Sequence, residues 1–168
     1  MKYCFWGLAL CLFVACQNEP APVEEDTVID LETLLPGTWE TIDIKMVLNT
    51  VNGQDSINFV HIAEGQWGKK IGMNPPRIYY LNDNKYRKER ITADGQIIET
   101  HRGIWNTFGD TLMMIEPDAT YQYIVKANDQ GLTEYRSLED LDGDGEVDDE
   151  YVGVQRLVSR SVKAEEQQ

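Results

Sequence analysis

Alternating apolar and polar residues predict that most of this chain forms β-strands. In residues 41–48 (TIDIKMVL) every even-numbered residue from Ile42 to Leu48 is apolar, whereas Asp43 and Lys45 lie between them. Because side chains along a strand alternate between its two faces, this segment predicts a half-buried strand with the even-numbered set inward. Further short runs that end at turn residues predict strands at 56–62, 77–81, 85–92, 96–105, 111–115, 121–127, 132–138 and 152–159.

The segments between these strands carry turn residues. Asp94-Gly95 is typical of a two-residue hairpin turn. Residues 28–35 predict a short helix that ends before Pro36-Gly37, and the glycine- and proline-rich residues 65–76 predict a long loop with an exposed or half-buried Trp67.

About nine short strands joined in sequence by tight turns favour an all-β fold. The expected architecture is an up-and-down antiparallel β-barrel of about eight to nine strands with a short N-terminal helix, because closing the sheet removes its exposed edges. A sandwich of two sheets remains the alternative. The barrel domain is expected at residues 28–162, and residues 163–168 are expected to form a disordered tail.

The first fifteen residues have the layout of a secretory signal peptide, with Lys2 ahead of an apolar run that is too short to span a bilayer. Phe13-Val14-Ala15-Cys16 resembles the lipobox of bacterial lipoproteins. The resemblance implies cleavage before Cys16 and attachment of lipid, such as palmitate, to that cysteine. An ordinary signal peptide with an incidental cysteine is the alternative. Residues 16–27, rich in proline and acid, are expected to be a flexible tether.

Charge and cysteine content exclude several functions. The formal net charge is −14, which disfavours nucleic-acid binding and leaves membrane attachment to the lipid. Cleavage would remove Cys4 and Cys11, so Cys16 would be the only thiol left and no internal disulfide or cysteine nucleophile could form. Gln17 follows the lipidated cysteine; it is not the aspartate that retains lipoproteins at the inner membrane of enteric bacteria, and the resemblance therefore implies an outer-membrane lipoprotein.

Residues 140–151 (DLDGDGEVDDEY) resemble the calcium loop of an EF-hand. Calcium is the expected ion because it accepts many oxygen ligands in flexible geometry. Position 12 is Tyr151 rather than glutamate, although Glu150 or Asp149 could supply the missing carboxylate. Strand-like segments flank the loop, so we expect a structural rather than a sensory site, with a dissociation constant of about 10⁻⁴–10⁻³ M. A solvated acidic turn is the alternative. The candidate ligands are Asp140, Asp142, Asp144, Glu146 and Asp148.

Gly37-Thr38-Trp39, between the predicted helix and the first strand, resembles the G-x-W signature of the lipocalin superfamily. The triplet recurs at residues 65–67 and 103–105, so its position carries the resemblance, together with the lipobox and the apolar last strand. The family implies a barrel that binds one small hydrophobic ligand, with Trp39 at the closed end. It also implies an arginine of the last strand over that indole, for which Arg156 is the first candidate and Arg160 the second.

The expected function is therefore ligand binding by a lipid-anchored envelope protein. A non-catalytic module that docks on another envelope protein is the alternative, and no enzyme motif surrounds His61 or His101. In the basic segment 85–90 (KYRKER), alternation puts Tyr86, Lys88 and Arg90 on one face and Lys85, Arg87 and Glu89 on the other. If one of these sets faces inward, it would suit an acidic head group, whereas a solvated edge is the simpler interpretation. The candidate ligand-binding residues are Trp67, Tyr80, Tyr86, Arg90, Trp105 and Tyr123.

Overall fold

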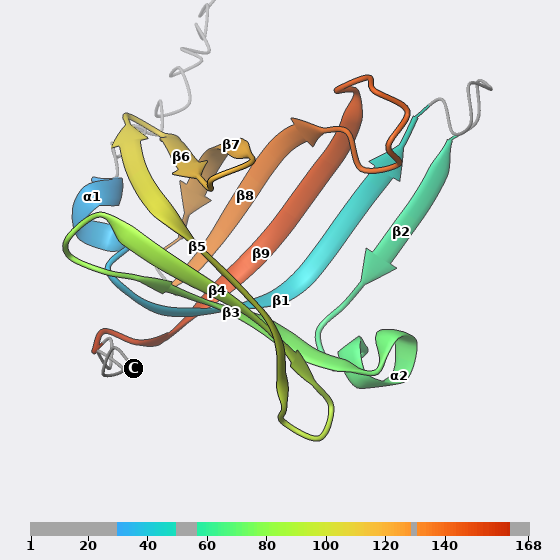
Figure 1. Ribbon diagram of the computed structural model, residues 1–168, viewed down its shortest axis with the longest axis horizontal. Coiled ribbons are helices and arrows are strands. Elements are labelled where there is room, and N and C mark those ends of the chain that lie inside the picture. Colours follow the sequence, from blue (N-terminus) through green and yellow to red (C-terminus); the bar gives the residue numbers. More distant parts are fainter. Residues whose placement is uncertain (1–29, 50–56, 129–130, 162–168) are drawn as a thin grey trace, which may run out of the picture.

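The computed structural model describes residues 30–49, 57–128 and 131–161, which form two short helices and nine strands (Figure 1). The elements in chain order are α1 (Leu31–Leu34), β1 (Gly37–Leu48), β2 (Asn58–Ile62), α2 (Trp67–Ile71), β3 (Met73–Tyr80), β4 (Lys85–Thr92), β5 (Ile97–Phe108), β6 (Thr111–Ile115), β7 (Thr120–Ala127), β8 (Leu132–Glu139) and β9 (Asp149–Ser159).

The strands form one antiparallel sheet that closes into a barrel. Its order is β2-β1-β3-β4-β5-β6-β7-β8-β9, and a further pairing of β1 with β9 joins the two sides. Long β1 makes closure possible: its first residues pair with β3, its last residues pair with β2, and nearly its whole length pairs with β9. The predicted barrel is confirmed, with eight strands in the closed ring and β2 as an extra strand, and the sandwich is excluded.

Every described helix and strand lies between residues 31 and 159, so a chain that begins at residue 17 carries all of them. The predicted signal peptide (1–15), tether (16–27) and tail (163–168) lie outside the described residues.

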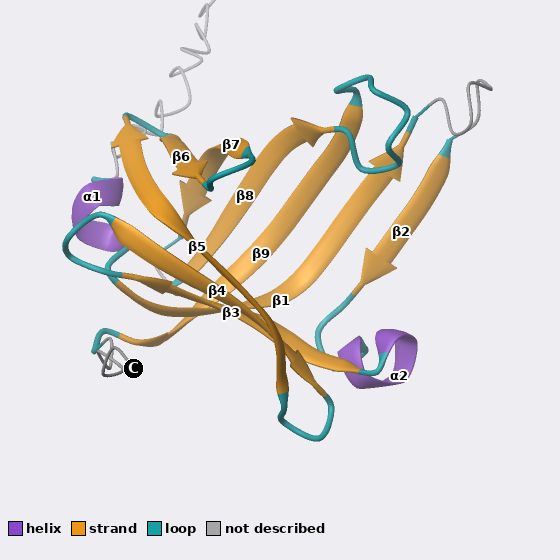
Figure 2. Ribbon diagram, in the orientation of Figure 1, coloured by secondary structure: helices purple, strands orange, loops and turns teal. Residues whose placement is uncertain are grey.

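Helix α1 lies at one end of the barrel (Figure 2). A buried core that contains Leu31 of α1 and several aromatic residues closes this end. The side chain of Asp30 caps α1 by accepting a hydrogen bond from the backbone N–H of Glu32. The Trp39 indole is fully buried and donates from Nε1 to the carbonyl of Leu35 at 2.7 Å. The other members of this core are Leu31, Leu35, Ile78, Tyr80, Tyr86, Trp105, Leu112, Met114, Val125 and Tyr135.

A β-bulge in β1 corrects the predicted face of that strand. The pairing with β9 shifts register between Thr41 and Asp43, so the strand holds one extra residue there. Thr41, Ile44 and Met46 face the barrel interior, but Ile42 does not line it. Simple alternation across residues 41–48 therefore places Ile42 on the wrong side.

The prediction of a long loop at residues 65–76 is wrong. Residues 67–71 form α2, and β3 begins at Met73. Trp67 is only 4% exposed, because its indole packs against β1 and donates from Nε1 to the carbonyl of Ile42 at 2.9 Å. The β3–β4 pairing skips from Asn74 to Arg77, which accommodates two prolines that have no N–H to donate.

Candidate functional site

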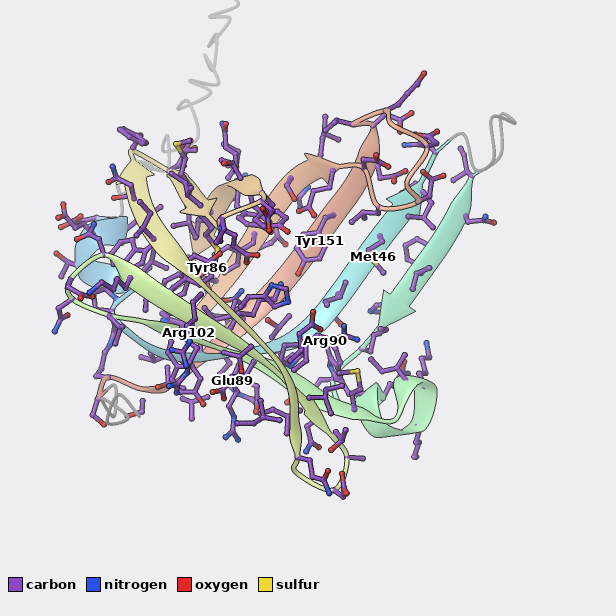
Figure 3. All side chains as sticks on the ribbon, viewed as in Figure 1. Met46, Tyr86, Glu89, Arg90, Arg102 and Tyr151 are labelled. Atoms are coloured by element: carbon purple, nitrogen blue, oxygen red, sulfur yellow. The ribbon has the colours of Figure 1, made fainter. Side chains whose placement is uncertain are left out.

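The barrel holds a cavity of about 360 Å³, and its lining includes Trp67 and Ile71 of α2. Helix α2 lies on the opposite side of the barrel from α1 (Figure 1). The volume of the cavity lies within the range of small-molecule sites. Figure 3 labels three of its lining residues, Met46, Arg90 and Tyr151. Much of the wall is apolar, and the main contributors are Ile44, Met46, Ile62, Met73, Ile78 and Met114.

Lys88 and Arg90 bring positive charge to the cavity from β4. The register places Lys88 opposite His101 and Arg90 opposite Glu99 on β5. Arg90 pairs with Glu99, with 2.6 Å between Nη1 and Oε2. Among the described residues, the half-buried Lys88 ammonium has neither a hydrogen bond nor an ion pair. It is therefore a cation available to a ligand.

A hydrogen-bonded network links this basic wall to the closed end. His101 lies between two carboxylates, with Nε2 2.7 Å from Glu99 Oε1 and Nδ1 3.1 Å from Glu116 Oε2. The Tyr86 hydroxyl donates to the other Glu116 oxygen at 2.7 Å. Burial raises the pKa of Tyr86 far above its ordinary value, and this hydrogen bond is the second cause of the shift. The phenol therefore stays protonated.

Four tyrosines form the wall contributed by β7, β8 and β9. Tyr123 is central: its ring stacks on Tyr121 with centroids 6.4 Å apart and meets Tyr135 and Tyr151 edge-on at 6.1 and 6.0 Å. All four line the cavity together with Glu139. This aromatic wall lies across the barrel from the basic residues of β4.

Two residues of the cavity wall have a buried polar atom without a hydrogen-bond partner among the described residues, Tyr135 Oη and Gln155 Oε1, and so does Thr133 Oγ1, on the cross-strand neighbour of Gln155. Tyr135, Gln155 and Thr133 are only 2%, 5% and 1% exposed. Thr133 and Tyr80 lie near the Tyr135 hydroxyl without meeting hydrogen-bond geometry, and burial raises the pKa of Tyr135 to about 12. Unpaired buried polar groups cost about 1–3 kcal/mol each, so a partner in the cavity would be stabilising.

The acidic loop gathers three carboxylates, Asp140, Asp142 and Asp149, whose nearest oxygens lie within 4.8 Å of one another. Asp149 is fully buried. One of its oxygens accepts from Asn49 N at 2.7 Å, and the other accepts from Leu141 N at 2.7 Å and Asp142 N at 3.2 Å. Asp149 therefore joins the loop to the ends of β1 and β9.

The predicted ligand set agrees with this group only in part. Asp140 and Asp142 belong to it, whereas Asp144, Glu146 and Asp148 do not. Asp144 instead accepts from the backbone N–H of Glu146 at 2.8 Å, as short turns of Asp and Gly commonly do. The sequence offered Asp149 only as a substitute for the missing glutamate of position 12, whereas the structure makes it a member of this group.

Of the six predicted ligand-binding residues, Trp67, Arg90 and Tyr123 line the cavity. The other three belong to the core of the closed end, and Figure 3 shows Tyr86 nearer α1 than Arg90 is. Tyr80 packs edge-on against Trp105 with centroids 5.8 Å apart. Reasoning from sequence also missed Glu116, Glu139, Tyr151 and Gln155 as lining residues, whereas Lys88 lies on the same face of its strand as Arg90, as alternation predicts.

The prediction that Arg156 lies over the Trp39 indole is wrong. Trp39 pairs with Leu157, and alternation turns Arg156 outward, where it forms ion pairs with Glu64 at 2.7 Å and Glu40 at 3.5 Å. Arg160, the second candidate, hydrogen-bonds to the carbonyl oxygens of residues 34 and 36 beside Trp39.

The expected role of Gly37 in the fold has a steric basis. Its φ is 145°, and a Cβ at this position would lie 2.7 Å from the carbonyl oxygen of Ser159. Glycine therefore lets β1 start in close contact with the end of β9.

Comparisons with known proteins give no identification. No protein-family profile matches the chain, and no curated protein matches it. No helix among residues 30–49, 57–128 and 131–161 is long and apolar enough to cross a membrane.

Proposed function

We propose that this protein is a lipid-anchored, non-catalytic, lipocalin-like barrel that binds one small, largely apolar ligand in its cavity. The observation that carries the proposal is the cavity itself, which combines an apolar wall with buried polar atoms that lack partners. A core built only for stability would fill such a space or pair such atoms.

The unpaired cation of Lys88 supports a ligand with an acidic group. Lys88 lies in the cavity wall beside His101, and no carboxylate among the described residues forms an ion pair with it. An anion attracts a partly desolvated ammonium more strongly than an exposed one, because water screens the charges less.

Replacing Lys88 by glutamine should weaken binding of octanoate, a probe with a short apolar chain and one carboxylate, by about ten-fold or more. The charge is lost while most of the side chain stays. Isothermal titration calorimetry on residues 17–168 measures the effect. Lys126→Gln, which removes an exposed cation of β7, is the matched control. Equal weakening in both variants, or none in Lys88→Gln, would contradict this assignment.

The membrane anchor in the proposal rests on the lipobox alone, since Cys16 lies outside the described residues. Cys16→Ser should abolish incorporation of a clickable palmitate analogue into the protein in a bacterial host and move the chain from the outer-membrane fraction to the soluble envelope fraction. Unchanged labelling and fractionation would leave an ordinary signal peptide as the better explanation.

We extend the proposal to a structural calcium ion at the acidic loop. Asp142 Oδ2 is buried and has no hydrogen-bond partner in the described chain. Desolvation and the neighbouring carboxylates of Asp144, Asp149 and Asp140 raise the pKa of Asp142, against a hydrogen bond from Asp144 N that lowers it. A cation beside these carboxylates would relieve that repulsion.

Calcium at about a hundred times its dissociation constant should stabilise residues 17–168 by about 2.7 kcal/mol. Thermal unfolding with calcium and with chelator measures the difference. Asp142→Asn should remove most of it, whereas Asp118→Asn, in a distant turn, should leave it intact. An unfolding temperature that does not respond to calcium would mean that the loop is a solvated acidic turn.

One observation favours the alternative of a docking module. Ile104 on β5 and Ile115 on β6 are direct cross-strand neighbours, and both are exposed on the outer face, as is Phe108. Adjoining apolar side chains of this kind often mark a protein contact. Ile104→Ser should abolish binding to an envelope protein if this face docks, and it should leave octanoate binding unchanged in either case.

A further inference from the structure

The aromatic wall of the cavity carries a carboxylate without a cationic partner. Glu139, at the end of β8, lines the cavity beside Tyr121, Tyr123 and Tyr151. Its carboxylate accepts a hydrogen bond from a neutral group, because Ser137 Oγ donates to Oε1 at 2.5 Å. No lysine, arginine or histidine among the described residues forms an ion pair with Glu139.

The carboxylate lies close to the tyrosine rings. Burial is the first cause, and the charge of Glu139 the second, of the raised pKa of both Tyr123 and Tyr151. Both phenols therefore stay neutral, and their electron-rich ring faces remain beside a negative charge. Aromatic faces attract a cation by about 0.5–2 kcal/mol, and a nearby carboxylate adds a direct charge pair.

The second unpaired charge of the cavity lies on the opposite wall. In the closed ring β1-β3-β4-β5-β6-β7-β8-β9, strands β4 and β8 are separated by the same number of strands in either direction. Lys88 on β4 and Glu139 on β8 therefore lie on opposite walls of the barrel, and both line the cavity. The other two charged lining residues have partners: Arg90 pairs with Glu99, and Glu116 with His101.

We propose that the ligand is a zwitterion whose protonated amine binds among Tyr121, Tyr123 and Tyr151 with Glu139 as counter-ion, while its acidic group binds Lys88. This rests on the proposed function, because it assigns chemistry to the same cavity. A ligand with only an acid would leave the half-buried Glu139 without a cation, and a ligand with only an amine would leave the half-buried Lys88 without an anion. The apolar wall between them suits an aliphatic or aromatic body.

The buried acceptor of Gln155 supports an amine that carries hydrogens. Gln155 Oε1 has no donor among the described residues, and it lines the cavity next to the tyrosine wall, where Thr133 is its cross-strand neighbour. An N–H donor of the ligand would satisfy this oxygen, whereas a quaternary ammonium has none to give.

Three probes with the same chain test the assignment on residues 17–168: octanoate, octylamine and ω-aminooctanoate. Calorimetry should show ω-aminooctanoate binding about ten-fold or more tightly than either single-charge probe. Glu139→Gln should weaken the two amine probes by about ten-fold and leave octanoate unchanged. Glu150→Gln, which removes an exposed carboxylate of the same strand pair, controls for the general acidity of the protein.

A second pair of variants tests the aromatic contribution. Tyr123→Phe keeps the ring and should retain amine binding, whereas Tyr123→Leu should lose it, with thermal unfolding confirming that both variants fold. Equal weakening of amine binding by Glu139→Gln and Glu150→Gln would overturn the inference. So would octanoate binding as tightly as ω-aminooctanoate, a result that leaves the proposed function standing. If none of the three probes binds, both this inference and the proposed function are wrong.

Discussion

Asp149→Ala should destabilise the barrel by about 3–5 kcal/mol in urea unfolding of residues 17–168. The carboxylate is fully buried and accepts three backbone hydrogen bonds, from Asn49, Leu141 and Asp142. Alanine would leave these donors without their charged acceptor. The acidic loop would lose one of its links to β1 and keep the hydrogen bond from Asn49 Nδ2 to the Asp148 carbonyl at 2.7 Å. The effect should be present without calcium, because the hydrogen bonds need no metal.

Two further variants make that test specific. Asp149→Asn keeps one acceptor oxygen and should lose about half as much stability. Glu150→Ala, at the exposed next position, should change the free energy of unfolding by less than about 0.5 kcal/mol. If Asp149→Ala were as mild as Glu150→Ala, Asp149 would not hold the loop to the barrel.

Gly103→Ala should cost about 3 kcal/mol or more, at the top of the range for overpacking. A Cβ at this position would lie 2.2 Å from the carbonyl oxygen of Ile115 and 2.8 Å from the Tyr86 ring. The first contact is with backbone of the paired strand, so relief requires β5 and β6 to separate. Thermal or urea unfolding measures the loss.

Gly68→Ala is the matched control for that substitution. Gly68 lies in α2, and a Cβ there would meet nothing within 4 Å. Alanine favours helix over glycine, so stability should stay level or rise by up to about 1 kcal/mol. Unfolding at the same urea concentration in Gly103→Ala and wild type would show that β5 and β6 tolerate the added methyl group.

The architecture was predictable because its signals are local. The predicted strands 85–92 and 111–115 coincide with β4 and β6, since alternation and turn residues mark both ends of each. The bulge after Thr41 was not predictable in this way, because it depends on how β1 pairs with the distant β9. Trp67 was misjudged for the same reason: its burial depends on the Ile42 carbonyl, which only the folded barrel brings near.

The site was less predictable than the fold. Aromatic residues at strand positions face inward at both the closed end and the cavity, and a sequence does not say which level of the barrel each occupies. Trp105 therefore proved to be core, whereas Tyr151 faces the cavity. Lys88 and Glu139 lie on opposite walls of the cavity because β1 pairs with β9 and closes the ring. That pairing joins segments about a hundred residues apart in the sequence.

The most direct test of ligand binding is a native mass spectrum of residues 17–168, expressed in the native host with an unlipidated signal peptide and purified without detergent. We expect a discrete added mass of up to about a few hundred daltons, as a cavity of this size allows. This mass should be lost when the protein is denatured. The Lys88→Gln and Glu139→Gln variants should carry less of it than Lys126→Gln and Glu150→Gln do. A spectrum that shows only the protein mass would contradict ligand binding and favour the docking module.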